Sequence, residues 1–304
     1  MGPIYIGAGG WAYLDTKEKH KLEAYSKKFN FVEVNSTFYT FPKSALVRLW
    51  RRRVPSEFVF TVRCHRNLTH KYELRPVDEA FNIFDRMVEI CRELKAPILH
   101  LQTPHSLEFD GIRARLTRDF FSSTMTKDVR LAWEIRGRVS EEVVRLMEDF
   151  EIVQCVDISK EELAVESHML YTRLFGRGFH TLYQFDDEEL KQIEDKAKGY
   201  DFKEKFLTFH SLRMYEDAGR LKAHVEEGTF PSLKGPFGVD DLKRALVDAV
   251  FPCSKYRLIR DHGWKVVNMS EEMRVHVSKL LGEPHDRVYK NIDELLEEVV
   301  KKTH

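Results

Sequence analysis

Polar and charged side chains recur at alternate positions inside apolar stretches of this sequence. The clearest case is the stretch from Phe31 to Tyr39, which predicts a buried strand with Glu33 and Asn35 on one face. Both faces of a strand in a parallel sheet are covered, so a carboxylate at Glu33 needs a partner or a chemical role. Seven predicted strands carry such positions: Glu33, Asn35, Arg63, His65, His100, Gln102, Glu134, Arg136, Asp157, Arg173 and His210.

The mixture of residue types indicates which chemistry these positions support. Arginine at a rigid strand end is suited to bidentate capture of phosphate or carboxylate, and a neighbouring histidine or carboxylate can serve as general acid or base. The candidate catalytic residues are Glu33, Glu134, Asp157 and His210. The candidate substrate-binding residues are Trp11, Tyr13, Asn35, Arg63, His70, Gln102, Arg136 and Arg173.

Two alternatives stay open for these side chains. Histidines and carboxylates in one place can also hold a divalent metal ion, and the candidate ligands are His65, His210, Glu134 and Asp157. The set can instead be a buried network of ion pairs that fills a core. We favour a functional role because desolvating so many charges on separate strands is costly.

The elements that must position these residues alternate along the chain. Strands are predicted at 4–6, 31–39, 58–65, 98–102, 131–136, 152–157, 169–174 and 206–210. Helices are predicted at 17–29, 44–52, 78–94, 109–121, 187–198 and 215–227. Eight strands that alternate with helices predict an α/β fold, a (β/α)8 TIM barrel over residues 1–228. In such a barrel the polar strand ends converge at the C-terminal mouth, where barrel enzymes keep their sites.

The remainder of the chain departs from this alternation. After a break that contains Pro231, Gly235, Pro236 and Gly238, helices are predicted at 239–250, 254–261, 270–281 and 292–302, with one short strand at 264–267. Residues 229–304 are therefore expected to form a small, mainly helical C-terminal appendage, and a protein partner could bind there.

Composition limits the function classes. The chain of 304 residues carries 49 basic and 49 acidic residues, so any anion binding must be local. Four scattered cysteines without a C-x-x-C pair argue against a zinc or iron-sulfur knot and for a reducing compartment. With no signal peptide pattern and no apolar run of about 20 residues, we expect a cytoplasmic protein without a membrane partner. The 32% charged fraction is typical of thermophile surfaces.

Several motifs resemble the YecE-like family, TIM-barrel proteins that are classed as a domain of unknown function. They are Gly9-Gly10-Trp11-Ala12-Tyr13, Glu33-Val34-Asn35-Ser36-Thr37-Phe38-Tyr39, Leu68-Thr69-His70, Leu101-Gln102-Thr103-Pro104 and Trp133-Glu134-Ile135-Arg136. The resemblance covers residues 1–228 and implies a barrel, but it brings no assigned reaction. Gly137 and Phe175 stand where the family tends to have histidines, so the resemblance leaves room for a different chemistry.

We therefore expect a hydrolase that acts on an anionic, phosphate-bearing substrate at the barrel mouth, such as a nuclease or a DNA-repair enzyme. The partner would be a small anionic molecule or a nucleic acid. The alternative is a non-catalytic binding or scaffold protein that captures an anionic ligand in the mouth.

Overall fold

The computed structural model describes residues 2–303 except 125, 166, 179–181 and 283–286. The chain divides into two compact units. Unit 1 comprises residues 1–174 and 196–210, and unit 2 comprises residues 175–195 and 211–304. This division is by contacts, so the predicted boundary between residues 228 and 229 stays a prediction.

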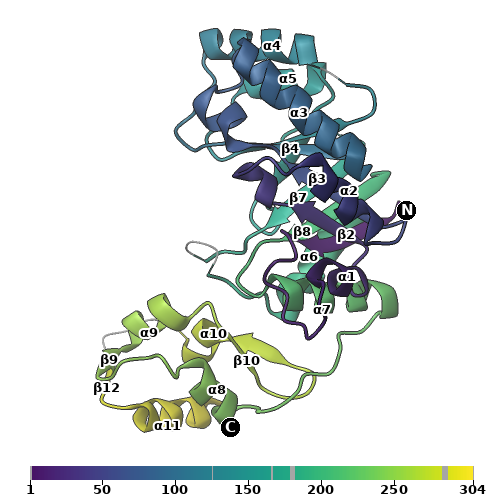
Figure 1. The fold of residues 1–304 in the computed structure, drawn as a ribbon. Helices are drawn as coiled ribbons and strands as arrows, with labels where there is room; N and C mark the ends of the chain where they lie inside the picture. Colours follow the sequence, from purple (N-terminus) through teal and green to yellow (C-terminus); the bar gives the residue numbers. More distant parts are fainter. Residues whose placement is uncertain (1, 125, 166, 179–181, 283–286, 304) are drawn as a thin grey trace. The chain divides into compact units, whose positions relative to one another are not determined.

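Unit 1 contains a closed barrel of parallel strands in the order β1 to β8, which confirms the predicted TIM barrel (Figure 1). The strands are β1 (Ile4–Ala8), β2 (Phe31–Val34), β3 (Val59–Arg63), β4 (Ile98–Thr103), β5 (Arg130–Ile135), β6 (Val153–Val156), β7 (Met169–Leu174) and β8 (Glu204–Phe209). The barrel closes where β1 pairs with β8, with Ile4 opposite Lys205 and Ala8 opposite Phe209.

Helices connect the strands along the chain. They are α1 (Lys21–Ser26), α2 (Ser44–Arg52), α3 (Asp78–Leu94), α4 (Gly111–Thr124), α5 (Glu141–Asp149) and α6 (Asp187–Gly199). The predicted bounds of α2 and α3 are confirmed. Helix α3 has acidic residues at Asp78 and Glu79 in its first turn, which suits the positive end of a helix dipole. In Figure 1, α3, α4 and α5 lie side by side, in agreement with their contacts.

The barrel interior consists of an apolar layer followed by a polar layer. Phe31, Ile98, Ala132, Tyr171 and Phe206 belong to one buried cluster. Two residues further along four of these strands, the chain has Glu33, His100, Glu134 and Arg173. Because side chains at i and i+2 share a strand face, the apolar layer fixes which side chains point inward at the carboxyl ends.

The second strand is shorter than predicted. Strand β2 ends at Val34, and Ser36–Phe38 form a 3-10 helix, η1. The hydroxyl of Thr37 donates to the carbonyl oxygens of Val34 and Arg63, at 2.8 Å and 2.6 Å. A side chain therefore occupies the carbonyl groups that a continuing strand would use for its own hydrogen bonds. The alternation of polar and apolar residues in the sequence does not reveal this competition.

Unit 2 has a core of its own, which includes Leu242, Leu258, Val277, Tyr289 and Leu295. Its elements are α7 (Met214–Glu227), α8 (Val239–Ala245), β9 (Cys253–Ser254), α9 (Lys255–His262), β10 (Val266–Asn268), β11 (Arg274–His276), α10 (Val277–Leu281), β12 (Val288–Tyr289) and α11 (Ile292–Thr303). Strand β10 pairs with β11, and β9 pairs with β12, both antiparallel.

Two helix predictions in this unit are corrected. The helix predicted at 270–281 is a strand followed by a short helix, because Val275 pairs with Val267 across β10 and β11. The helix predicted at 239–250 ends at Ala245. Among the described residues, no helix is both long and apolar enough to cross a membrane.

One buried hydroxyl connects the first helix to the barrel. The hydroxyl of Tyr25, a fully buried residue of α1, donates to the carbonyl oxygen of Phe31 and accepts from the amide of Ala8, both at 2.8 Å. It thus joins the last residue of β1 to the first residue of β2. The neighbouring Gly7 leaves room for the hydroxyl, because a Cβ at this position would lie 2.9 Å from the hydroxyl oxygen of Tyr25.

We predict that Tyr25→Phe lowers the free energy of unfolding, because it leaves the amide of Ala8 and the carbonyl of Phe31 buried without this partner. The expected loss is about 1 to 3 kcal/mol for each unpaired group. Urea unfolding measures it, with Tyr256→Phe, at a residue that is 60% exposed, as the control. Equal stability of the two variants would contradict the assigned role of the hydroxyl.

Candidate functional site

Arg173, in β7, lies between two buried carboxylates from other strands. Its Nε donates to Glu33 Oε1 over 3.2 Å, and its Nη1 donates to Glu134 Oε2. The side chains of Arg173 and Glu33 are 2% and 0% exposed. Little water reaches this ion pair, so its geometry depends on the strands that carry it.

Both carboxylates remain ionised at neutral pH. Burial acts to raise the pKa of Glu33, but Arg173 with His100, His210 and Arg63 holds it at about 2. Burial likewise opposes ionisation of Glu134, and Arg173 and His100 hold its pKa well below the usual range. The two carboxylates therefore act as fixed negative charges.

Tyr171 and His100 also contact these carboxylates. The hydroxyl of Tyr171 donates to Glu33 Oε2 at 2.6 Å and lies 2.8 Å from the hydroxyl of Thr61. Both ring nitrogens of His100 lie 3.3 Å from a carboxylate oxygen, one of Glu33 and one of Glu134. Burial lowers the pKa of this histidine, and the two carboxylates act against that shift.

His210 stands directly after β8, beside Arg173. Its Nε2 accepts a hydrogen bond from Arg173 Nε at 3.1 Å and lies 3.4 Å from Glu33 Oε1. Burial, followed by the charge of Arg173, lowers the pKa of His210 well below its usual value. At neutral pH the ring is therefore an uncharged imidazole.

Close packing against Gly9 accounts for one of the glycines that follow β1. A Cβ at Gly9 would lie 2.3 Å from Cε1 and 2.4 Å from Nδ1 of His210, and 2.5 Å from Nδ2 of Asn35. Asn35 Nδ2 donates to the carbonyl oxygen of Gly9 at 3.0 Å. Only a residue without a side chain allows this close approach.

Arg63 has uncharged partners in direct contact. Its Nη1 donates to Asn35 Oδ1 at 3.3 Å, and its Nη2 donates to Gln102 Oε1. Its Nε is buried and, among the described residues, has no hydrogen-bond partner. Burial, and then repulsion by Arg173, lowers the pKa of Arg63 to about 10, so the guanidinium keeps its charge at neutral pH.

Arg136 brings a third guanidinium to the same group. Its Nε donates to Glu134 Oε1, and its side chain is 41% exposed. Three guanidinium groups thus accompany two ionised carboxylates, while His210 is neutral. The site has an excess of positive charge, which favours an anion.

Aromatic side chains lie next to Arg63. Its guanidinium stacks on Phe38 at 3.7 Å, and His70 meets the same ring edge-on at 5.4 Å. Trp11 instead packs edge-on against Trp50 at 5.3 Å, and Tyr13 is 85% exposed. The barrel thus brings together five of the predicted binding residues: Asn35, Arg63, Gln102, Arg136 and Arg173. His70 contacts Phe38, the ring on which Arg63 stacks.

Two of the predicted residues have other surroundings. His65 stacks on Phe41 at 4.2 Å, and its Nδ1 accepts from the amide of Asn67 in the π-helix η2 (Asn67–Lys71). Asp157 follows β6 and accepts hydrogen bonds from the amide and the hydroxyl of Ser159, at 3.1 Å and 2.6 Å.

The donor groups of the barrel do not match the predicted metal ligands. His100, Glu134 and Cys155 have ligand atoms within 4.8 Å of one another, and of these Glu134 was predicted. Burial raises the pKa of the Cys155 thiol well above its usual value, so the thiolate that a metal needs is disfavoured. The carboxylate of Glu134 also faces Arg136 and Arg173. A metal ion in the barrel stays a prediction.

Sequence reasoning placed His100 among the inward polar residues without assigning it a role, and it did not select Tyr171 or Gly9. The signal was present for the first two, because Tyr171 stands two residues before Arg173 and His100 two residues before Gln102. Gly9 gave no such signal, since its role depends on His210, which is remote in the sequence.

Comparisons with known proteins are consistent with this architecture. The family model described as "Protein of unknown function DUF72" matches residues 5–233. The UPF0759 protein YunF of Bacillus subtilis is 33% identical over 89 residues, which cover 27% of this chain and 32% of that protein. The UPF0759 protein YecE of Escherichia coli K12 is 32% identical over 83 residues, 27% of this chain and 30% of that protein. The alignments thus span about a third of these relatives.

Two solved structures share the fold. A DUF72 family protein from Thermotoga maritima has a TM-score of 0.60 at 23% identity, over 74% of this chain and 99% of that chain. A DUF72 family protein from Enterococcus faecalis has a TM-score of 0.57 at 15% identity, over 74% and 98%.

We predict that Arg173→Met reverses a pH effect on stability. In the native protein the lowered pKa of Glu33 contributes stability above its unfolded pKa near 4.5, and this contribution is lost as the pH falls toward 2. Without Arg173, burial raises that pKa, so the folded variant binds a proton more readily than the unfolded chain. The variant should lose about 3 to 5 kcal/mol at pH 7 and less at pH 5.

Urea unfolding at both pH values measures the difference between the native protein and the variant. Arg145→Met, which removes an exposed partner of Glu141, serves as the control and should leave the pH dependence unchanged. A stability gap for Arg173→Met that stays constant from pH 7 to pH 5 would show that Arg173 does not hold the carboxylates ionised.

Proposed function

The chain belongs to the DUF72 family of proteins of unknown function, as its motifs indicated, and from this premise we propose that it is a hydrolase acting on an anionic, phosphate-bearing substrate at the mouth of the barrel. The family carries no assigned reaction, so the proposal rests on the side chains of this chain. A cytoplasmic location is part of the proposal; the four cysteines, all buried free thiols, fit a reducing compartment.

The observation that carries the proposal is the environment of Arg63. A half-buried guanidinium costs free energy unless a charge compensates it, and the hydrogen-bond acceptors in direct contact with Arg63 are the neutral oxygens of Asn35 and Gln102. Its Nε, without a partner among the described residues, supplies one more donor. A phosphate oxygen would satisfy both the charge and the donor, and Arg136 could bind a second oxygen.

The reaction would use His210 as the base. Water would attack phosphorus and form a new P–O bond, and the P–O bond to the leaving alcohol would break. The proton of the water would pass to Nε2 of the neutral His210 imidazole, which would release its hydrogen bond from Arg173 Nε and later return the proton to solvent, and the leaving oxygen would take a proton from solvent. Glu33 and Glu134 would hold Arg173 in place, and Arg173 would orient His210. These two carboxylates would therefore be positioning residues that do not touch the substrate.

The second candidate is non-catalytic capture of an anionic ligand. It is favoured by the almost complete burial of Glu33 and Glu134 and by their lowered pKa values, which suit fixed counter-charges better than proton donors. Asp157 would then have a structural role. Nucleic acid, a small phosphorylated molecule, and a protein partner at the C-terminal region remain proposed partners.

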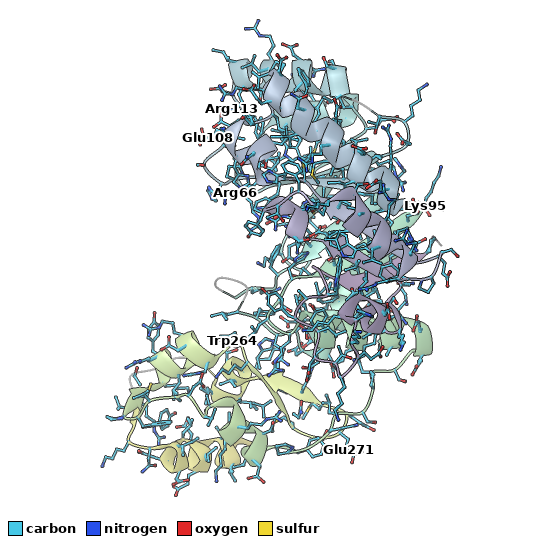
Figure 2. The ribbon with its side chains drawn as sticks, in the orientation of Figure 1. Arg66, Lys95, Glu108, Arg113, Trp264 and Glu271 are labelled. Carbon is cyan, nitrogen blue, oxygen red and sulfur yellow. The ribbon has the colours of Figure 1, made fainter. Side chains whose placement is uncertain are left out.

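We predict that Arg63→Gln weakens binding of inorganic phosphate by about 10- to 100-fold, the loss expected for one hydrogen bond to a charged group of about 1.5 to 3 kcal/mol. Calorimetric titration of the purified chain measures this. Arg66→Gln is the matched control, because Arg66 is an exposed arginine close by in the sequence (labelled in Figure 2). Equal affinity of both variants would refute anion capture by Arg63.

Catalysis needs a separate test. Phosphodiesters, sugar phosphates, RNA, and single-stranded, duplex and abasic DNA should be assayed with and without divalent metal. We predict that His210→Gln lowers kcat by about 100-fold or more with little change in phosphate affinity, since a general base contributes about 10²- to 10⁴-fold. Phosphate binding without turnover on any of these substrates would favour the binding protein.

A further inference from the structure

Unit 2 contains a cavity of about 850 Å³ that is separate from the residues of the barrel site. Its walls come from the C-terminal segment between Ile259 and Lys279 and from five residues before it, Arg177, Gly178, Leu182, Tyr183 and Glu189. The turn residue Trp264, labelled in Figure 2, and Tyr183 provide aromatic surface. This volume is typical of sites for small molecules.

Three metal-ligating groups meet at this cavity. The carboxylates of Asp186 and Glu189 and the imidazole of His276 have ligand atoms within 4.8 Å of one another. His276 Nε2 lies 3.0 Å from Glu189 Oε2 and 3.9 Å from Asp186 Oδ2. Atoms bound to one zinc ion at about 2.0 to 2.2 Å lie about 3 to 4 Å apart, so small adjustments would suffice.

The surrounding structure holds these groups in place. Asp186 and Glu189 exchange hydrogen bonds at the start of α6: the amide of Glu189 donates to Asp186 Oδ1 at 2.9 Å, and the amide of Asp186 donates to Glu189 Oε2 at 3.0 Å. Tyr183 donates its hydroxyl to Glu189 Oε1. His276 is fixed by the pairing of β11 with Val266. Supporting hydrogen bonds of this kind orient metal ligands.

We propose that Asp186, Glu189 and His276 bind a divalent transition-metal ion, of the zinc or manganese type. Imidazole together with carboxylate oxygen suits these ions. Glu189 and His276 line the cavity, so coordination positions that the protein leaves open face a space large enough for a small ligand. His276 lies beyond residue 233, where the family match ends.

Lys279 is the resident cation that the metal would displace. Its Nζ lies 2.9 Å from Asp186 Oδ2 and 3.2 Å from Glu188 Oε2. The side chains of Lys279 and Glu188 are 51% and 70% exposed, so the ammonium group can move to Glu188 while a metal takes Asp186. Lysine and metal therefore compete for one carboxylate.

The competing explanation is that these ion pairs only attach the C-terminal segment. That attachment is already provided by Arg274, whose fully buried guanidinium contacts Asp187 at 3.1 Å, Glu216 at 3.2 Å and Asp217 at 3.4 Å. Because Arg274 anchors β11 two residues before His276, the segment does not depend on His276 or Lys279 for its position.

The experiment measures binding of Zn²⁺ and Mn²⁺ to the metal-free full chain by calorimetry, and the nitrogen coupling of bound Mn²⁺ by electron paramagnetic resonance. We expect one ion per chain, with a nitrogen signal that His276→Gln removes together with an affinity loss of about tenfold or more. Lys279→Met should tighten binding several-fold, because the competitor is gone.

Lys191→Met is the matched control, since Lys191 is another partly exposed lysine of unit 2, paired with Asp195 in α6. It should leave metal affinity unchanged. Weaker binding to Lys279→Met, or an unchanged nitrogen signal in His276→Gln, would overturn the proposal, as would no binding by the native chain. Lys279→Met removes a half-exposed side chain, so it tests the site even if His276→Gln unfolds.

Discussion

The barrel site depends on one buried guanidinium. Arg173 neutralises carboxylates from two other strands, Glu33 of β2 and Glu134 of β5, and it also contacts His210 after β8. Charges desolvated to this degree are stable only when their partners are held within narrow distances. The closed sheet supplies that constraint, because each strand is fixed by two neighbours. The same contacts set the protonation states of the site, since they keep both carboxylates ionised and His210 neutral.

Much of this arrangement could be predicted from alternation along strands. Phe31 and Glu33, or Tyr171 and Arg173, share a face because the period of a strand is two, so the convergence of polar ends followed from the sequence pattern. The outward position of Trp133, which packs against Phe109 and Phe121, follows from the same rule.

Other features depended on contacts between distant residues. Strand β2 ends at Val34, where the hydroxyl of Thr37 binds the carbonyl oxygens of Val34 and Arg63. Asn35 therefore lies outside the strand, and it still accepts a hydrogen bond from Arg63. The strand β11 was predicted as part of a helix because its own residue pattern also fits a helix, although it pairs with β10. Gly9 could not be recognised without the position of His210.

The anchoring of Arg274 has a consequence for where this polypeptide can be divided. The family match ends at residue 233, yet the fully buried carboxylate of Asp217, inside the match, is compensated by Arg274 outside it. Burial already raises the pKa of Asp217 to about 7 against the opposing charge of Arg274. A fragment trimmed to the family boundary would therefore keep a buried acid without its counter-ion. The family match and the energetically independent part of the chain therefore end at different residues.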